Sequence, residues 1–259
     1  MDRSVQTADE LRQLVERGVD ELSFAPDLGT LAPPMRYALA GGGKRLRPVL
    51  CLATAEALGI DVERALPAAL AIELVHTFSM VHDDLPALDD DDSRRGRPTV
   101  HVEFGEATAV LVGDALLAEA FRLALVYDTP EVARELARMT LGMIGGQELD
   151  LAGGGDLATL HALKTGRLFE ASVVCGLHVA EIAEDDQQPW RQFAQELGLL
   201  FQVADDILDG DGFVVERGID GARTLADEIS AHTRSRLDEL DADTSVLAEI
   251  AAAVAARAA

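Results

Sequence analysis

The feature that most restricts the fold of this chain is a succession of long apolar stretches with helical spacing, separated by short breaks. The first begins after Thr7, where Leu11, Leu14, Val15 and Val19 recur at the spacing of one helix face. Further helices are predicted at 33–40, 46–59, 62–84, 106–128, 130–151, 156–183, 188–209, 217–240 and 243–258. No segment convincingly shows the alternation of a β-strand. The pattern therefore predicts an all-α protein.

The breaks between these stretches are too short to be domain linkers. They fall at Gly59, 86–98, Pro130, 153–155, 185–186 and 210–212. No repeat of fixed period is present, and the hydrophobic content of 48% is sufficient for one large core. The stretches from 62 to 183 are apolar around much of their circumference, as in helices at the middle of a bundle. We therefore expect residues 1–259 to form a single helical domain.

The formal net charge of −24 restricts the partners of this chain. It disfavours nonspecific binding to nucleic acid or to an anionic membrane, so any anionic ligand needs a local cluster of cations. Cys51 and Cys175 lie in apolar helical stretches without metal-binding spacing, so we expect buried thiols in a reducing compartment. No leader pattern begins the chain, and no stretch approaches the ~20 apolar residues of a membrane span. A cytoplasmic location is expected.

Residues 198–212, GLLFQVADDILDGDG, place paired carboxylates on a helix that is otherwise apolar. On an ideal helix Asp205 and Asp209 lie about 40° apart, so both carboxylates can reach one cation. A buried carboxylate needs such a partner, because an isolated one would be neutralised. The alternative is a solvated helix end rich in aspartate.

A second acidic cluster lies at 81–92, VHDDLPALDDDD, with six carboxylates within ten positions. On an unbroken helix Asp83 and Asp89 would point about 120° apart. Pro86 ends or kinks the helix, so the following residues can bring Asp89 back beside Asp83. His76 lies about 20° from the direction of Asp83 and is expected to face the same cavity, although an ordinary core histidine is the alternative.

Cationic side chains occur in two groups, one directly after an acidic cluster and one earlier in the sequence. Arg94, Arg95 and Arg97 follow the first cluster at once, and GGGKRLRP at 41–48 adds three more cations after flexible glycines. Carboxylates select hard divalent cations, and Mg²⁺ is usually bound by one or two carboxylates plus substrate phosphates. The guanidinium group of arginine can donate two parallel hydrogen bonds to phosphate oxygens. The combination predicts a diphosphate clamp, although GGGKRLRP alone would be a solvated basic turn.

Five segments together resemble the trans-isoprenyl diphosphate synthases of the polyprenyl synthetase family, and are most similar to the bacterial farnesyl diphosphate synthase branch. In chain order they are GGGKRLRP, ELVHTFSMVHDDLPALD with the following RR, GQELDL at 146–151, KTGRLF at 164–169 and GLLFQVADDILD. The resemblance covers about residues 30–212. It implies an all-helical isoprenoid-synthase fold, usually homodimeric, with a central cavity between the two aspartate motifs.

The resemblance also implies a role for each matching residue. The metal ligands would be Asp83, Asp84, Asp89, Asp205, Asp206 and Asp209, which would bridge three Mg²⁺ ions to an allylic diphosphate. The diphosphate of isopentenyl diphosphate would be bound by Lys44, Arg47, His76 and Arg95. The allylic diphosphate would be held by Arg94 and Lys164, and Thr165 and Gln202 would line the region where positive charge develops. The chemistry would be ionisation to an allylic carbocation, attack by the alkene and loss of a proton.

Product length is predicted from Phe78, which lies about 7.5 Å along the helix from Asp83, where a growing hydrocarbon tail would descend. An aromatic ring there would floor the pocket. With small Ser79 beside it, the family pattern favours a C15 product, farnesyl diphosphate; a geranyl or geranylgeranyl product is the alternative. Phe78 could also be an ordinary core residue.

The chain departs from the family pattern after the second motif. The family usually continues there with a lysine-containing loop that helps to hold the allylic diphosphate, whereas residues 210–228 contain no lysine. Arg217 or Arg223 would have to substitute, or this part of the phosphate site is missing. Two other interpretations therefore stay open: a terpene synthase on the same scaffold, which would not need the isopentenyl diphosphate residues, and a non-catalytic partner subunit.

Overall fold

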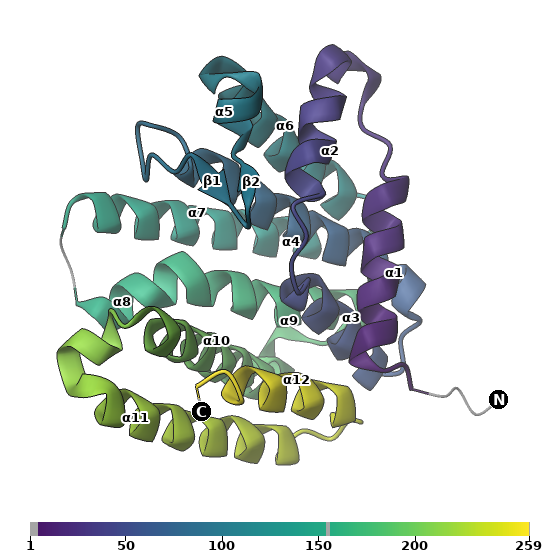
Figure 1. Cartoon of the computed structure of the whole chain (residues 1–259). Helices are drawn as coiled ribbons and strands as arrows, with labels where there is room; N and C mark the ends of the chain where they lie inside the picture. Colours follow the sequence, from purple (N-terminus) through teal and green to yellow (C-terminus); the bar gives the residue numbers. More distant parts are fainter. Residues whose placement is uncertain (1–4, 154–155, 259) are drawn as a thin grey trace.

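The computed structural model describes residues 5–153 and 156–258, and most of these residues are helical. The helices follow one another in the predicted order (Figure 1). The predicted break at 153–155 lies partly outside these ranges, as do residues 1–4 and 259 of the predicted domain. The α-helices are α1 (Ala8–Glu21), α2 (Ala32–Leu39), α3 (Leu46–Ala57), α4 (Val62–Asp83), α5 (Val100–Phe104), α6 (Glu106–Ala124), α7 (Glu131–Leu151), α8 (Leu157–His161), α9 (Arg167–Val179), α10 (Gln188–Asp209), α11 (Phe213–Asp238) and α12 (Ser245–Ala255). Two short 3₁₀ helices, η1 (Pro26–Leu31) and η3 (Glu184–Asp186), and a π-helical turn, η2 (Ala162–Gly166), complete the helical elements.

Local sequence signals explain where several of these helices begin and end. Thr7 and Glu10 form a capping box at the start of α1, in which each side chain accepts a hydrogen bond from the other residue's backbone N–H. Prolines occupy the first turn of α2 and of α10, where their missing N–H is not needed. Gly210, in the left-handed conformation, ends α10. These residues confirm the predicted all-α architecture.

The structure corrects the sequence-based prediction at two places. The expectation of no strand was wrong, because the predicted break at 86–98 contains a small antiparallel hairpin, β1 (Ser93–Arg94) paired with β2 (Arg97–Pro98), and α5 follows it. The stretch predicted as one helix at 156–183 is divided into α8, the π-helical turn η2 and α9. Both differences lie beside predicted site residues.

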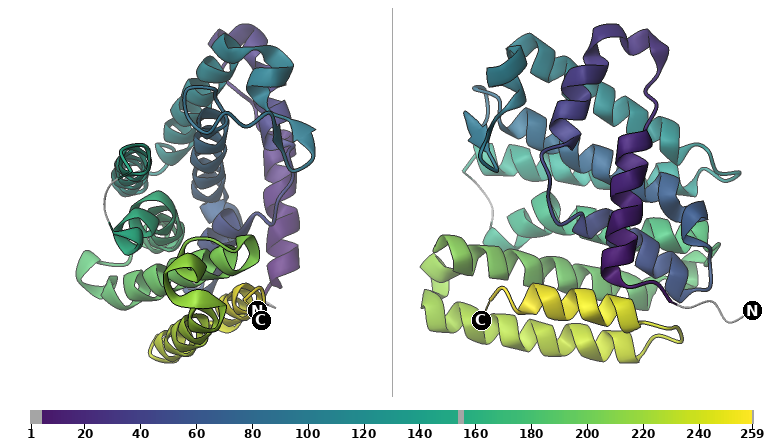
Figure 2. Two further views of the ribbon diagram at one scale, coloured as in Figure 1. Left: turned by 60° about the vertical axis from the view of Figure 1, so that its left-hand side comes forward. Right: turned by 45° about the vertical axis from the view of Figure 1, so that its right-hand side comes forward.

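The bundle is built around α4 and α9, which pack against each other. α4 also contacts α3 and α6, and α9 contacts α3, α7 and α10. Figures 1 and 2 show α7, α9, α10 and α11 with similarly oriented axes and alternating chain directions, with α1 crossing them and α12 lying along α11. The long helices α4 and α10, which end in the two aspartate motifs, therefore belong to one packed core.

By length and composition alone α4 could cross a membrane, which contradicts our expectation that no stretch of the chain approaches a membrane span. Its most apolar window is 67% buried inside the protein. Since α4 is surrounded by α3, α6 and α9, it has the position of a core helix.

Candidate diphosphate and metal site

A pocket of about 250 Å³ gathers cationic side chains from distant parts of the chain. We call it the anion pocket, and its lining residues are Gly43, Lys44, Arg45, Leu46, Arg47, Glu73, His76, Arg95, Phe201 and Arg257. All four residues that the resemblance assigned to isopentenyl diphosphate are among them. The start of α3, the middle of α4 and the tip of the β1–β2 hairpin therefore meet at one place.

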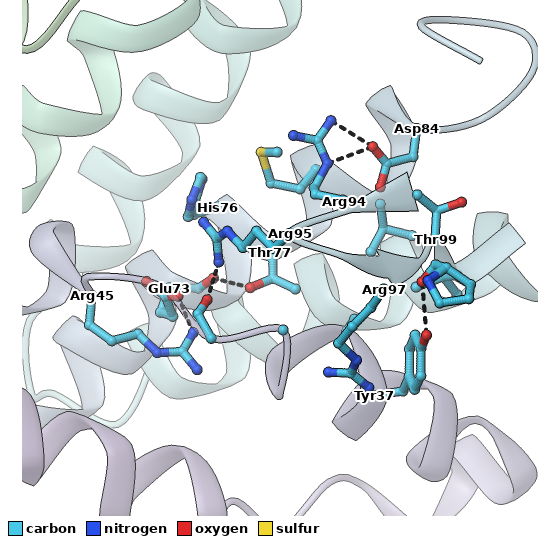
Figure 3. A pocket seen from close by; sticks show the side chains of 17 residues that line it. Tyr37, Arg45, Glu73, His76, Thr77, Asp84, Arg94, Arg95, Arg97 and Thr99 are labelled. Atoms are coloured by element: carbon cyan, nitrogen blue, oxygen red, sulfur yellow. Dashed lines mark hydrogen bonds and ion pairs between the residues drawn. The ribbon is translucent and has the colours of Figure 1, made fainter. Parts of the chain in front are cut away.

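A smaller pocket of about 70 Å³ adjoins the anion pocket and shares Arg45, Glu73, His76 and Arg95 with it (Figure 3). Its other end is lined by the Asp84–Arg94 ion pair and by Arg97, whose guanidinium lies 4.2 Å from the centroid of the Tyr37 ring. The shared residues connect the anion pocket to the first aspartate motif.

The β1–β2 hairpin positions Arg95 at its tip. Arg95 and Gly96 both have positive φ, as the central residues of a type I′ turn require. A guanidinium N–H of Arg95 donates to the carbonyl of Gly42. Gly43, also at positive φ, leaves room for this side chain, because a Cβ at residue 43 would lie 2.6 Å from Nη1 of Arg95. The glycines before α3 therefore allow the hairpin tip to close over the pocket.

Arg45, predicted only as part of the basic turn, is a structural residue. Its guanidinium donates to Glu73 Oε1 at 2.5 Å, to Glu16 Oε1 at 3.1 Å and to the carbonyl of Leu39 at 2.7 Å. Arg45 is only 6% exposed and its charge is matched by these two carboxylates. It therefore organises the floor of the anion pocket and adds little free positive charge.

Arg47 and His76 have unusual electrostatic environments in this pocket. Burial lowers the pKa of Arg47 to about 10, with partial compensation from Glu73 and Asp205, and its Nε atom is buried without a hydrogen-bond partner among the described residues. Burial and the surrounding arginines hold the pKa of His76 well below its usual 6.5. His76 is therefore neutral at physiological pH and offers a hydrogen bond, whereas Arg47 remains a cation.

The first aspartate motif turns back on itself as the kink at Pro86 predicted. The backbone N–H of Asp89 donates to the carbonyl of Asp83 at 2.8 Å. Asp84 is buried and accepts from Arg94 Nε at 2.7 Å, so Arg94, which the resemblance assigned to the allylic diphosphate, is held on a carboxylate in this structure. Burial raises the pKa of Asp83 to about 6, and the nearby Asp89 charge adds to the increase. Asp83 and exposed Asp89 are thus close carboxylates that a cation would stabilise.

The carboxylates of the second motif point in different directions. Asp206 is buried and accepts from the side chain of Gln202 at 2.8 Å and from the backbone N–H of Phe213 at 2.9 Å, which joins α10 to α11. Gly212 is required there, since a Cβ would lie 2.1 Å from Oδ2 of Asp206. Asp205 forms an ion pair with Arg257, and Asp209 is exposed at the end of α10.

The π-helical turn η2 lies between the two motifs. Lys164 Nζ donates to Asp150 Oδ2 at 2.5 Å, and its charge also lowers the pKa of Asp83 in part. The next residue, Thr165, donates to Gln202 Oε1 at 3.0 Å, and Gln202 in turn donates to Asp206. η2 therefore places Lys164 within the field of the first motif while Thr165 contacts the second. Adjacent residues of η2 thus connect the two motifs, and the cavity predicted between them stays a prediction.

The donor set fits a hard divalent cation. Asp83, Asp89 and Asp209 supply oxygen donors without a basic partner in any ion pair of the described residues, and the raised pKa of Asp83 reflects an electrostatic need for positive charge. Within residues 5–153 and 156–258, no three His, Cys, Asp or Glu side chains are grouped closely enough to hold a metal ion by themselves. Substrate phosphate oxygens would have to complete the coordination.

The remaining predicted residues lie outside the anion pocket. Phe78 is 7% exposed and contacts the ring of His82 edge to face, with centroids 5.0 Å apart. Ser79 donates to the carbonyl of His76 at 2.9 Å. Arg217 lies over the ring of Phe213 at 5.9 Å, and Arg223 is exposed on α11. The roles predicted for these residues, and for the metal ligands, stay predictions.

Sequence reasoning missed Arg257, which lines the anion pocket from the segment after α12. Its guanidinium lies 4.7 Å from the centroid of the Phe201 ring. The only local signal was a single arginine in an alanine-rich stretch, AAAVAARAA, which carries no motif.

Comparisons with known proteins agree on one family. A family model described as "Polyprenyl synthetase" matches residues 29–216. The chain is 44% identical to geranylgeranyl diphosphate synthase of Cyanophora paradoxa over 192 residues, which are 68% of this chain and 64% of that protein. It is 42% identical to farnesyl diphosphate synthase of Bacillus subtilis over 199 residues, 71% of this chain and 67% of that protein. It thus spans about two thirds of the length of these two relatives.

Other matches cover a larger share of the protein that is compared with this chain. The large subunit 1 of a heterodimeric geranylgeranyl pyrophosphate synthase of Arabidopsis thaliana is 37% identical over 270 residues, covering 89% of this chain and 73% of that protein. A crystal structure of an FPP/GFPP synthase from Zymomonas mobilis superposes with a TM-score of 0.83 at 32% identity, over 96% of this chain and 100% of that one.

Proposed function

Since this chain belongs to the polyprenyl synthetase family, we propose that it is a short-chain trans-prenyltransferase that joins isopentenyl diphosphate to an allylic diphosphate. One observation carries the proposal: Lys44, Arg47, His76 and Arg95 line a single pocket. Three cations and a neutral imidazole gathered in this way, in a chain of net charge −24, form a local site for an anion. Asp83 and Asp89 belong to the same motif as Asp84, which lines the neighbouring smaller pocket, and they would supply the metal-binding half of the site.

The main product we propose is farnesyl diphosphate. The names of the relatives include both farnesyl and geranylgeranyl diphosphate synthases, so support for C15 comes from this chain itself. Phe78 is bulky, buried and held against His82, which itself bonds to the carbonyl of Val110 on α6 at 3.1 Å. A braced aromatic ring one and a half turns before Asp83 would limit how far a hydrocarbon tail descends. A geranyl or geranylgeranyl product remains the alternative.

The side chains support the reaction by charge and orientation. Lys44, Arg47 and Arg95 would bind the diphosphate of isopentenyl diphosphate, and neutral His76 would add a hydrogen bond. Mg²⁺, three ions by the family pattern, would neutralise charge on the departing allylic diphosphate. Its ligands would be the six predicted aspartates, Asp83, Asp84, Asp89, Asp205, Asp206 and Asp209. The carbonyl oxygen of Gln202 and the hydroxyl of Thr165, fixed by their mutual hydrogen bond, are dipoles beside the developing positive charge. No nucleophilic side chain is needed.

We also infer a homodimer in the cytoplasm. Exposed apolar side chains on α5, α6 and α7 support self-association; they are Val102, Phe104, Val110, Leu111, Leu141 and Ile144. The two cysteines are buried and free, which suits a reducing compartment.

A non-catalytic subunit is the second candidate, and one observation favours it. Where the family carries a lysine-containing loop, this chain makes a tight turn at 210–212 and enters α11 at once. The presence in the anion pocket of all four residues predicted to bind isopentenyl diphosphate argues against a non-catalytic subunit. The same set argues against a terpene synthase, which does not use isopentenyl diphosphate.

Turnover with defined substrates distinguishes these functions. Purified protein is incubated with Mg²⁺, labelled isopentenyl diphosphate, and dimethylallyl or geranyl diphosphate. Elongated prenyl diphosphates are the expected products, with C15 predominant. Hydrocarbons or alcohols formed from the allylic substrate alone would indicate a terpene synthase, and absence of turnover would indicate a subunit that needs a partner.

A further inference from the structure

Arg257 joins the second aspartate motif to the anion pocket. It follows α12 and turns back to α10, where its Nη2 forms an ion pair with Asp205 and its guanidinium lies against the ring of Phe201. The side chain is 21% exposed, so it is largely enclosed. Arg257 therefore lies between a predicted metal ligand and a predicted phosphate-binding cluster.

Arg47 and Arg257 both line the anion pocket, and each has one buried donor without a partner. Nη1 of Arg257 and Nε of Arg47 are both buried, and neither has a hydrogen-bond partner among the described residues. Both guanidinium groups lie against Phe201, at 4.7 Å and 5.7 Å from its centroid. A buried donor without an acceptor is unfavourable, and guanidinium groups match the oxygens of a phosphate. The pocket lining therefore holds more guanidinium donors than acceptors, which favours an anionic ligand.

We propose that Arg257 is a fifth ligand of the bound diphosphate in the anion pocket, and that Asp205 restrains it until a cation takes that carboxylate. This inference rests on the proposed function, since it assumes that a diphosphate occupies the pocket. It adds a residue from outside the family motifs, in a chain that lacks the lysine-containing loop.

The Asp205–Arg257 pair connects the two halves of the site. While Asp205 holds Nη2, one edge of the guanidinium is used and part of its charge is neutralised. A divalent cation at Asp205 would compete for the carboxylate and leave the whole guanidinium to the diphosphate. Binding at the second motif and binding in the anion pocket are then thermodynamically coupled, and the coupling is reciprocal.

The restraint of Arg257 by Asp205 can be tested without any metal. Binding of inorganic pyrophosphate is measured by calorimetry in the presence of EDTA for the unmodified chain, Arg257→Ala, Asp205→Asn and the double variant. Asp205→Asn keeps the size of the side chain but removes the charge that restrains Arg257. Arg64→Ala is the matched control, because Arg64 is an exposed arginine with one distant carboxylate partner, Glu181 at 3.9 Å.

Arg257→Ala is expected to weaken pyrophosphate binding about tenfold to a hundredfold, the usual effect of losing hydrogen bonds to a charged group. Asp205→Asn is expected to tighten binding several-fold, and the double variant should bind like Arg257→Ala alone. A double variant that keeps the tightening of Asp205→Asn would show that Arg257 does not act through this pair. Circular dichroism and thermal unfolding of each variant identify any change due to misfolding.

The design separates the failure of this inference from that of the proposed function. If the unmodified chain does not bind pyrophosphate or isopentenyl diphosphate, the anion pocket itself is refuted. If it binds both, but Arg257→Ala behaves like Arg64→Ala, only the role of Arg257 is refuted. In turnover assays, Arg257→Ala should raise the KM for isopentenyl diphosphate while leaving the KM for the allylic substrate nearly unchanged.

Discussion

Replacing Asp83 with asparagine should stabilise the metal-free protein while removing its metal-dependent turnover. Burial raises the pKa of this carboxyl from 3.8 to about 6, and the charges of Asp89 and Asp84 contribute in the same direction. A raised carboxyl pKa means that the folded state disfavours the charged form. The free energy of unfolding therefore falls as the pH rises from about 4 through about 6, and the penalty is complete at pH 8.

The size of the effect follows from the difference between the two pKa values. At about 1.4 kcal/mol per pH unit, a rise from 3.8 to about 6 corresponds to about 3 kcal/mol. Asp83 is partly exposed, so solvent screening reduces the expected gain from Asp83→Asn to about 1–2 kcal/mol at pH 8. About half of that difference should remain at pH 5, where the folded protein already carries the proton, and almost none below pH 4.

Urea unfolding in EDTA at pH 8 and pH 5 measures this difference, with Asp185→Asn as the control for loss of one exposed aspartate. A stabilised but inactive Asp83→Asn protein would show that the negative charge of Asp83 is needed for turnover and lowers the free energy of unfolding. If the variant were less stable than the unmodified protein at pH 8, or if the difference did not change with pH, the electrostatic argument for a cation at Asp83 would be wrong.

Two further substitutions test the pocket depth and the turn after α10. Phe78→Ala should lengthen the main product beyond C15, as measured by chromatography of the dephosphorylated products, at a stability cost of about 3–5 kcal/mol; unchanged product length would remove Phe78 as the pocket floor. Asp206→Ala should destabilise the protein by about 2–4 kcal/mol, because the buried N–H of Phe213 and the amide of Gln202 lose their acceptor. Thermal unfolding of metal-free Asp206→Ala that matches the unmodified protein would contradict this structural role.

The helices could be predicted because their signals are local. Periodicity, the capping box at Thr7 and the glycine at 210 are readable within a few residues, and α10 matches its predicted bounds of 188–209. The return of Asp89 to Asp83 was also predictable, since it depends on one proline within the motif. The resemblance to a known family then supplied residues that local geometry alone could not bring together.

The hairpin at 93–98 could not be read in this way. Each strand has two residues, too few for an alternating pattern, and its type I′ turn uses Arg95 where asparagine or glycine is usual. Arg95 is held in this conformation by contacts outside the hairpin, above all with Gly42. A strained backbone set by tertiary contacts leaves no signature in the local sequence.

The pairing of charges was equally inaccessible, because it joins residues far apart in the chain. In the sequence, Arg45, Arg47 and Arg94 are alike, since each lies in a short basic stretch. In the structure Arg45 is matched by Glu73, and Arg94 by Asp84, whereas Arg47 forms no ion pair among the described residues. Only an arginine without an ion pair, such as Arg47, can bind a ligand without first breaking its contact with a carboxylate.

This distinction changes how the acidic motifs should be understood. Arg94 on Asp84 and Arg257 on Asp205 place a cation on one carboxylate of each motif before any ligand arrives. A divalent cation and a diphosphate arriving together would exchange these partners, because the metal would take the carboxylates and the arginines would take phosphate oxygens. Neither member of these two ion pairs would then be left unpaired. The metal alone would leave the arginines without an anionic partner, and the diphosphate alone would leave the carboxylates without a cation. The arrangement therefore favours joint binding of metal and diphosphate over binding of each separately.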